Sequence, residues 1–445
     1  MRDLALRQSA AVALAMFLGA AAICAGLFPA AFWVLMTGGL AAGALLVVWR
    51  RLELVSACWF VLAACTPEMA LHDWIGPEAF QPTIAAVKGT GLLLALFCAM
   101  RFGPAADPFN PGFAFAAMFV AGLAHGLFPG LTVADSLRSL VGSAAPYAFA
   151  FARPGPRWCA GIIRAAKIAP LVAVAAGAAL DVAGLRPLFI DSGGLRLAAT
   201  GHPAFLAGAA LTAIYACLIE YYRQGRDRDL ALLAANFAVL LLTGARAPLL
   251  YGALVVGSTL AFVPSAAVSP SARRLVLLAG AAAIPVFLAA AASLESLRVF
   301  NLLLNDDAGD LSGRAALWPY FARAAQSSPW FGWGVGAGNL VVPPRSEVIQ
   351  LMHTWAAHNE WLRMEVEGGQ IGRALLVLWF ALWAWRHTRR LQFAERVIMR
   401  LVFVAFACHA WTDNVLISTS ASVLFTFCIA VFARGAAGSR APESG

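Results

Sequence analysis

The chain has 445 residues, of which 61% are hydrophobic and only 12% are charged, and its formal net charge is +9. A soluble protein carries about twice that share of charged residues, so the composition excludes a soluble globular fold. The basic residues are dispersed over connecting loops and form no patch or stripe, which argues against a nucleic-acid-binding protein.

Long apolar stretches recur along the chain, each of about 18 to 20 residues, enough to cross a bilayer core as a helix. Strand-like alternation is missing, so helices rather than a barrel must satisfy the backbone. We predict an all-α, polytopic integral membrane protein with about 12 to 14 transmembrane helices and one long loop. The predicted spans are residues 9–27, 30–48, 52–66, 82–100, 112–129, 134–152, 160–183, 203–222, 229–243, 246–264, 273–292, 367–386, 396–412 and 416–434.

The arginines indicate how these spans are oriented. They follow alternate spans, for example Arg50 and Arg51 after the second span and Arg389 and Arg390 after the twelfth. Loops on the opposite side hold acidic residues such as Glu68. The positive-inside rule then places both termini in the cytoplasm. We expect the first span to stay uncleaved, because the parity of the other spans requires it.

A long polar insert separates the eleventh and twelfth predicted spans and lies outside the cytoplasm by the same rule. Most ionisable groups outside the short connecting loops lie in this insert, so we predict the active site there. The predicted domains are an N-terminal helix bundle, residues 1–292; the extracytoplasmic loop with short interfacial helices and the catalytic motifs, residues 293–366; and the last helices with a cytoplasmic tail, residues 367–445.

The insert itself contains helix signals. Ser312 can cap a helix that runs through Trp318 and Phe321, where apolar groups recur at helical spacing. We expect Pro319 to interrupt or kink this helix. A second helix is predicted to begin near His358 and to continue into the twelfth span.

Polar residues also break the apolar pattern elsewhere on the outer side. They occur at residues 191–196 and 201–203 before the eighth span, at the turn 243–248, and at His409 and Asp413 near the end of the thirteenth span. Because His409 and Asp413 are four positions apart, we expect them to form a structural pair on one helix face.

Several short motifs follow one another in a fixed order along this frame. They are Arg196 with Gly201-His202-Pro203, Thr243-Gly244-Ala245-Arg246, Ser312-Gly313-Arg314 with Leu317-Trp318, Pro329-x-Phe331-Gly332-x-Gly334-x-Gly336, His358-Asn359-x-x-Leu362, and Glu367-x-Gly369-x-x-Gly372. In this order they resemble the O-antigen ligase and polymerase superfamily over roughly residues 195–415. Ala204, Ala245 and Pro319 depart from the family pattern, but none of these departures removes an ionisable group.

The resemblance implies a GT-C-like membrane glycosyltransferase of the bacterial inner (cytoplasmic) membrane, with its active site facing the periplasm. The donor would be a glycan on polyprenyl (undecaprenyl) diphosphate, and the acceptor hydroxyl would belong to lipid A–core or to a growing polysaccharide. The resemblance implies no nucleotide sugar, no metal and no other cofactor. Membrane lipid surrounds such an enzyme, and other polysaccharide-assembly proteins are its possible partners.

The chemistry of the residues agrees with this reading. Guanidinium groups meet phosphate oxygens bidentately and stay charged, so Arg246 and Arg314, with Arg196 as a third candidate, suit a diphosphate leaving group. His358 is the candidate base for the acceptor hydroxyl, because its side chain titrates near neutrality. Direct attack with a base inverts the anomeric carbon. The alternatives are arginines that snorkel at helix ends or lie solvated in loops, and a histidine that caps a helix.

Four further residues within the motifs are candidates for binding substrate: His202, Asn359, Glu367 and Trp318. Glu367 has a structural alternative, because Arg363 lies four positions before it and the two can pair on one helix face.

Metal ligands are not expected. The run of Asn, Asp and Gly over residues 305–310 lacks EF-hand spacing and is typical of a solvated turn. His353 and His358 are not on one helical face, and no cysteine is near them, which argues against zinc.

Two other function classes remain open. A transporter or flippase of lipid-linked oligosaccharides would need polar groups at mid-membrane, whereas here they gather at the outer rim. A non-catalytic protein of envelope-polysaccharide assembly would not depend on His358. Ligase, polymerase and protein-glycan transferase share these motifs, so the sequence does not select the acceptor.

Overall fold

The computed structural model describes residues 43, 45–192, 194–290, 316–352, 354 and 356–438. The chain divides into two compact units, Met1–Val55 and Ser56–Gly445. The first two predicted spans therefore lie largely outside the described residues. The second unit contains nearly all of the described helices.

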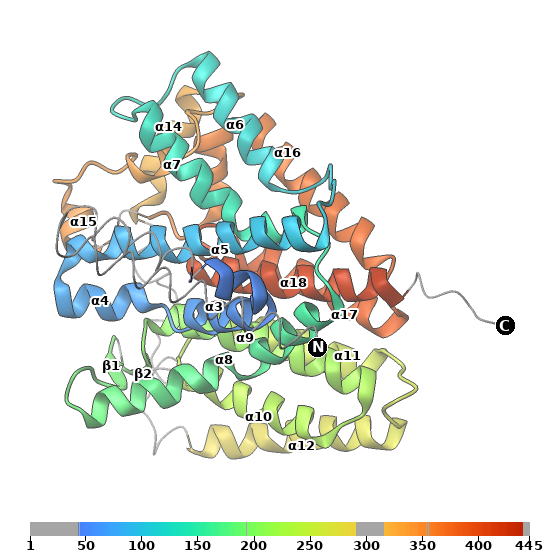
Figure 1. Ribbon diagram of the computed structural model, residues 1–445. Helices are drawn as coiled ribbons and strands as arrows, with labels where there is room; N and C mark the ends of the chain where they lie inside the picture. Colours follow the sequence, from blue (N-terminus) through green and yellow to red (C-terminus); the bar gives the residue numbers. More distant parts are fainter. Residues whose placement is uncertain are drawn as a thin grey trace, which may run out of the picture. The chain divides into compact units, whose positions relative to one another are not determined.

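Helices dominate the described part of the chain, which confirms the predicted all-α class (Figure 1). The elements in chain order are α3 (Leu52–Ala64), α4 (Pro67–Ile75), η1 (Pro77–Ala79), α5 (Phe80–Phe102), α6 (Gly112–His125), α7 (Val133–Ala144), η2 (Ala145–Phe151), α8 (Pro156–Val182), β1 (Phe189–Asp191), β2 (Leu195–Leu197), α9 (Pro203–Gln224), α10 (Asp227–Leu242), α11 (Arg246–Phe262), α12 (Pro270–Ala290), α14 (Trp318–Ser327), η6 (Ala337–Asn339), α15 (Glu347–Met352), α16 (Glu360–Thr388), α17 (Phe393–His409) and α18 (Thr419–Gly438).

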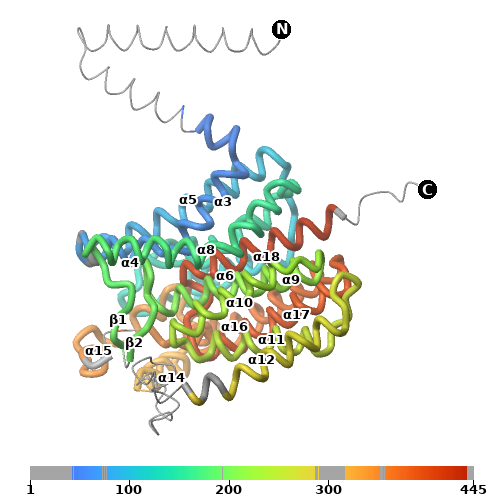
Figure 2. Tube along the Cα trace, turned by 90° about the horizontal axis from the view of Figure 1, so that it is seen from below, coloured from blue at the N-terminus to red at the C-terminus, as the bar shows by residue number. Residues whose placement is uncertain are grey.

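Helix α9 lies at the centre of the second unit. It packs against α8, α10, α11, α17 and α18, and Figure 2 shows several of these helices running side by side. Its small residues Ala207, Ala210 and Ala213 are fully buried. Small side chains let helix backbones approach closely, which is how helices associate inside a membrane.

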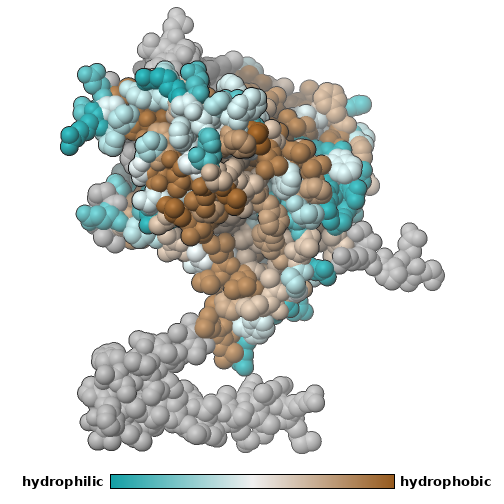
Figure 3. Space-filling view, turned by 90° about the horizontal axis from the view of Figure 1, so that it is seen from above, coloured by the Kyte–Doolittle hydropathy of each residue, from teal (hydrophilic) through white to brown (hydrophobic). Residues whose placement is uncertain are grey.

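Four of the described helices, α5, α8, α9 and α18, are long and apolar enough to cross a membrane, and α3, α6 and α11 are shorter apolar helices. Large apolar side chains stay exposed on the outside of the second unit, such as Val120 on α6, Leu254 on α11 and Val404 on α17. Figure 3 shows apolar side chains gathered over one face of the molecule. Hydrocarbon rather than water suits such a surface, so the chain is a polytopic membrane protein.

Two local features differ from the expected spans. The stretch predicted as one span over residues 134–152 forms α7 followed by the 3-10 helix η2. Pro146 explains the change, because its nitrogen carries no hydrogen and cannot continue the helical hydrogen bonds of α7. The other difference is a short hairpin, in which Ile190 of β1 pairs with Arg196 of β2. Asp191 accepts a hydrogen bond from Gly194 N across its turn.

Candidate active site

The glycine-rich part of the insert is hydrogen-bonded to a break in α16. Gly369 has φ 60° and ψ −165°, so the helix is interrupted there. The backbone oxygens just before the break accept from the insert: Val366 O from Trp333 N at 2.8 Å, and Glu367 O from Gly334 N at 3.0 Å. Two of the motifs found in the sequence thus meet in space.

The close approach explains why both motifs contain glycine. A Cβ on Gly332 would lie 2.5 Å from Gly369 N, and a Cβ on Gly369 would lie 2.4 Å from the backbone of Trp330. Both glycines have positive φ, which side chains disfavour. The insert is therefore held against α16 by backbone, with no room for side chains between.

Helix α14 supports the segment before His358. Pro319 lies in the first turn of α14, where a proline is tolerated because the first N–H groups have no helical partner. The predicted interruption concerns a helix from Ser312, whose first residues, 312–315, lie outside the described residues. Trp318 Nε1 donates to Ala357 O at 3.1 Å. The proposed substrate-binding residue Trp318 thus also ties the helix to the residue before His358. Ser312 lies outside the described residues.

His358 precedes α16 and is oriented by an aspartate. Its Nδ1 lies 3.2 Å from Asp413 Oδ1, and its Nε2 lies 3.4 Å from Thr354 Oγ1. The two side chains are 23% and 28% exposed, so the pair is accessible from outside. His358 has φ 47°, an uncommon conformation for a residue other than glycine. With Nδ1–H donating to Asp413, Nε2 carries the acceptor lone pair, which Thr354 Oγ1 approaches at 3.4 Å.

Asp413 is the functional candidate that the sequence reading underrated. It was expected to pair with His409, and that contact exists, at 3.9 Å between His409 Nε2 and Asp413 Oδ2. The shorter contact is to His358. Asp413 also lies beyond the end of α17 and not on its face. The sequence could have indicated Asp413, because His358 and Asp413 both adjoin predicted outer ends of spans.

The first turns of α16 contain an N-cap and a buried cluster of ion pairs. Helix α16 begins at Glu360, as predicted, and the N-cap Asn359 accepts from Leu362 N at 3.2 Å. Arg363 donates to Glu367 at 3.1 Å and 3.2 Å. Asn359 and Glu367 are buried, so both side chains are engaged in holding the helix.

Arg196 and His202 bring two other motifs to the same region. Arg196 Nε donates to Thr243 O at 2.8 Å, which joins the β-hairpin to the turn between α10 and α11. His202 caps α9 by accepting from Ala204 N at 3.2 Å. Burial, together with the charge of Arg196, lowers the pKa of His202 to about 4. A neutral ring suits this acceptor role.

Arg246 and Arg314 are the other two candidate arginines. Arg246 is the first residue of α11 and is exposed; its side chain makes no hydrogen bond or ion pair with the described residues. Arg314 and the acidic run at 305–310 lie outside the described residues. Within the described ranges, no group of three or more His, Cys, Asp or Glu side chains could hold a metal ion.

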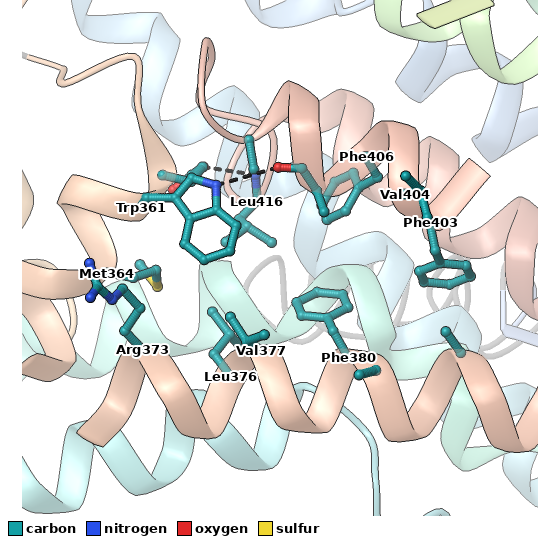
Figure 4. Close-up of a pocket in the computed structure, with 15 residues that line it drawn as sticks. Trp361, Met364, Arg373, Leu376, Val377, Phe380, Phe403, Val404, Phe406 and Leu416 are labelled. Carbon is teal, nitrogen blue, oxygen red and sulfur yellow. Dashed lines mark hydrogen bonds between the residues drawn. The ribbon is translucent and has the colours of Figure 1, made fainter. Parts of the chain in front are cut away.

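An apolar pocket of about 250 Å³ lies between α16 and α17 (Figure 4). Trp361 and Leu416 stand at one end, and Phe380 and Phe403 lie farther along. Glu360, which also lines the pocket, is two residues from the proposed base His358. His358 and Asp413 do not line the pocket, whose volume offers space for an apolar chain.

A comparison with known proteins finds one family whose model matches part of the chain. Residues 230–377 match the model of the family described as O-Antigen ligase. This match confirms the resemblance to the O-antigen ligase and polymerase superfamily. It begins in α10 and ends in α16, and so includes Arg246, the glycine-rich loop and His358, while Arg196, His202 and Asp413 lie outside it. No curated protein matches the chain.

Proposed function

We propose that this chain is an O-antigen ligase- or polymerase-like glycosyltransferase. It moves a glycan from a polyprenyl (undecaprenyl) diphosphate donor to an acceptor hydroxyl at the periplasmic face of the bacterial inner membrane. The observation that carries the proposal is the hydrogen-bonded pair of His358 and Asp413. The O-Antigen ligase match over His358 and Arg246 supports it.

In the proposed reaction, Nε2 of His358 takes the proton of the acceptor hydroxyl while Asp413 holds the ring through Nδ1. The hydroxyl oxygen forms a bond to the anomeric carbon. The bond from that carbon to the diphosphate oxygen breaks, and its electron pair leaves with the polyprenyl diphosphate. Attack from the side opposite the leaving group inverts the anomeric carbon.

The arginines would stabilise the charge that grows on the leaving diphosphate. Arg246 is proposed as a diphosphate ligand on its motif, and its exposed side chain has no described partner to compete with a phosphate. Arg196 holds the neighbouring turn through Thr243 O, and so would position Arg246. Arg314 is proposed as a second diphosphate ligand on its motif. A preorganised charged donor lowers such a barrier by about 3 kcal/mol.

The apolar pocket between α16 and α17 would receive the first part of the donor's lipid chain. Its lining is almost entirely hydrocarbon, including Leu376, Phe380 and Val404. Burial of apolar surface stabilises binding by roughly 25 cal/mol per Å². Glu360 lines the pocket and follows His358 by two residues, so we propose that the diphosphate lies toward that end.

A transporter or flippase is the second reading, and it needs an ionisable path through the membrane. The deeply buried Lys88 and Lys167 are instead hydrogen-bonded to protein groups, which favours an enzyme. A non-catalytic assembly protein is distinguished by the dependence of transfer on His358.

Reconstitution tests the proposed function. The purified chain in lipid vesicles is given a polyprenyl-diphosphate glycan with either lipid A–core or a free glycan as acceptor. A single shift of lipid A–core on a gel identifies a ligase, and a ladder identifies a polymerase. Activity should persist in EDTA. A reaction that EDTA abolishes and Mg²⁺ restores, or the absence of transfer to either acceptor, would contradict the proposal.

A further inference from the structure

The connection between α17 and α18, residues 410–418, carries Asp413 and is held by buried polar side chains. Lys88 on α5 is 9% exposed. Its Nζ donates to Ile417 O in the connection at 2.8 Å and to Gly142 O in α7 at 3.1 Å. A lysine inside an apolar helix is costly unless its donors are satisfied. Here they are satisfied by backbone oxygens of two other segments.

Glu360 holds the same connection from the side of α16. Its backbone N donates to Ala410 O at 2.8 Å, and its Oε1 accepts from Leu416 N at 2.8 Å. Together with Lys88, Glu360 therefore fixes backbone atoms on both sides of Asp413. Thr419, at the start of α18, adds a hydrogen bond from its hydroxyl to Glu68 at 2.5 Å.

Glu360 also belongs to the segment that carries the proposed base. It follows His358 by two residues, and its second carboxylate oxygen accepts from Arg363 Nε at 2.5 Å. The carboxylate of Glu360 thus connects the segment of His358 to the connection that bears Asp413. The 3.2 Å contact between His358 and Asp413 is made by these two segments.

We infer that Lys88 and Glu360 are positioning residues that set the His358–Asp413 hydrogen bond by fixing the 410–418 connection. The inference rests on the proposed function for its effect on rate. Lys88 is not proposed to touch substrate, and the positioning role of Glu360 is carried by its hydrogen bonds to Ala410 O and Leu416 N, although it also lines the pocket. A small displacement of Asp413 would turn the His358 ring, and misplacement by about 1 Å can slow an enzyme on the order of 100-fold.

A second reading is that Lys88 only packs α5 against its neighbours, as α5 and α18 lie side by side (Figure 1). Lys167 supplies a matched control for that reading. It is 6% exposed, and its Nζ pairs with Asp229 of α10 at 2.5 Å. Losing Lys167 removes a buried amine without touching residues 410–418, and so should lower stability without changing the turnover of folded protein.

The test compares Lys88→Met and Lys167→Met in the full chain. Lys88→Met should lower kcat on the order of 10- to 100-fold per folded molecule, with the donor KM almost unchanged. Because Lys88 acts through Asp413, the double variant Lys88→Met/Asp413→Asn should be no slower than Asp413→Asn alone. Full kcat in folded Lys88→Met, or losses that multiply in the double variant, would overturn the inference.

Hydrogen exchange supplies a readout that does not need activity. Amides of residues 410–418 should exchange faster in Lys88→Met than in Lys167→Met. Equal protection in the two variants would overturn the inference. If His358→Asn is fully active, the proposed function fails, yet exchange still tests whether Lys88 holds the connection.

Discussion

His358 and Asp413 are 55 positions apart in the sequence, and their side chains lie 3.2 Å apart, Nδ1 to Oδ1. One residue precedes α16 and the other follows α17. The pair therefore exists only when the start of α16 and the end of α17 lie together. A histidine oriented by a carboxylate is a common arrangement for a general base.

The first prediction concerns the proposed base. His358→Asn should lower transfer at least 100-fold, because general base catalysis contributes about 10² to 10⁴. Asparagine is chosen because it tolerates the positive φ of this position better than alanine. The exposed His125→Asn on α6 is the control and should stay active. Transfer is measured in vesicles; normal transfer by His358→Asn would remove His358 from the mechanism.

The second prediction concerns the proposed diphosphate ligand Arg246. Arg246→Ala should keep its expression and thermal stability, because the side chain is exposed and has no described partner. Transfer should fall on the order of 10²- to 10³-fold. Arg246→Lys should recover only part of it, since an ammonium cannot bind bidentately. Arg138→Ala, whose side chain is 79% exposed, is the control. Equal activity of the two alanine variants would show that Arg246 begins α11 but takes no part in transfer.

The third prediction concerns the contact between the glycine-rich loop and α16. Gly332→Ala should lower the free energy of unfolding by more than about 1 kcal/mol, because φ is positive and the added Cβ would meet backbone. Gly257→Ala on α11 is the control, since nothing lies within 4 Å of a Cβ there. Thermal unfolding in detergent compares them. A Gly332→Ala midpoint equal to that of wild type would contradict the described packing.

The fourth prediction concerns pH and His202. Its folded pKa of about 4 lies below its ordinary value, so between about pH 6.5 and 4 the unfolded state binds the extra proton. Stability should therefore fall as pH falls through this window, by up to about 3 kcal/mol. His202→Asn keeps an N-cap but does not titrate, so its free energy of unfolding should fall less than that of the wild type between pH 7 and pH 4.5. An identical fall in the free energy of unfolding of the wild type and His202→Asn would refute the lowered pKa of His202.

Much of the fold could be predicted from hydrophobic runs alone. The hairpin of α10 and α11 and the start of α16 near His358 follow the sequence pattern. The division of one span into α7 and η2 was missed because apolar content hides the local effect of Pro146. The place of Pro319 in the first turn of α14 was not predicted either, because a proline can end a helix or begin one.

The candidate site could be predicted residue by residue but not as a set of contacts. Motif order singles out His358, Arg246 and Glu367. It does not reveal that Glu367 is buried in an ion pair with Arg363, because burial depends on which other segments pack against α16. Nor does it reveal Asp413 as the partner of His358, since nothing local in either segment encodes the other.

The interruption of α16 at Gly369 has a consequence for how the enzyme would sense its surroundings. At that point Val366 O and Glu367 O, which a continuous helix would bond internally, accept hydrogen bonds from the glycine-rich loop instead. If α16 spans the bilayer, any tilt that a thicker or thinner bilayer imposes on it would shift the loop with it. Lipid thickness would then act, through shared backbone, on the proposed active site.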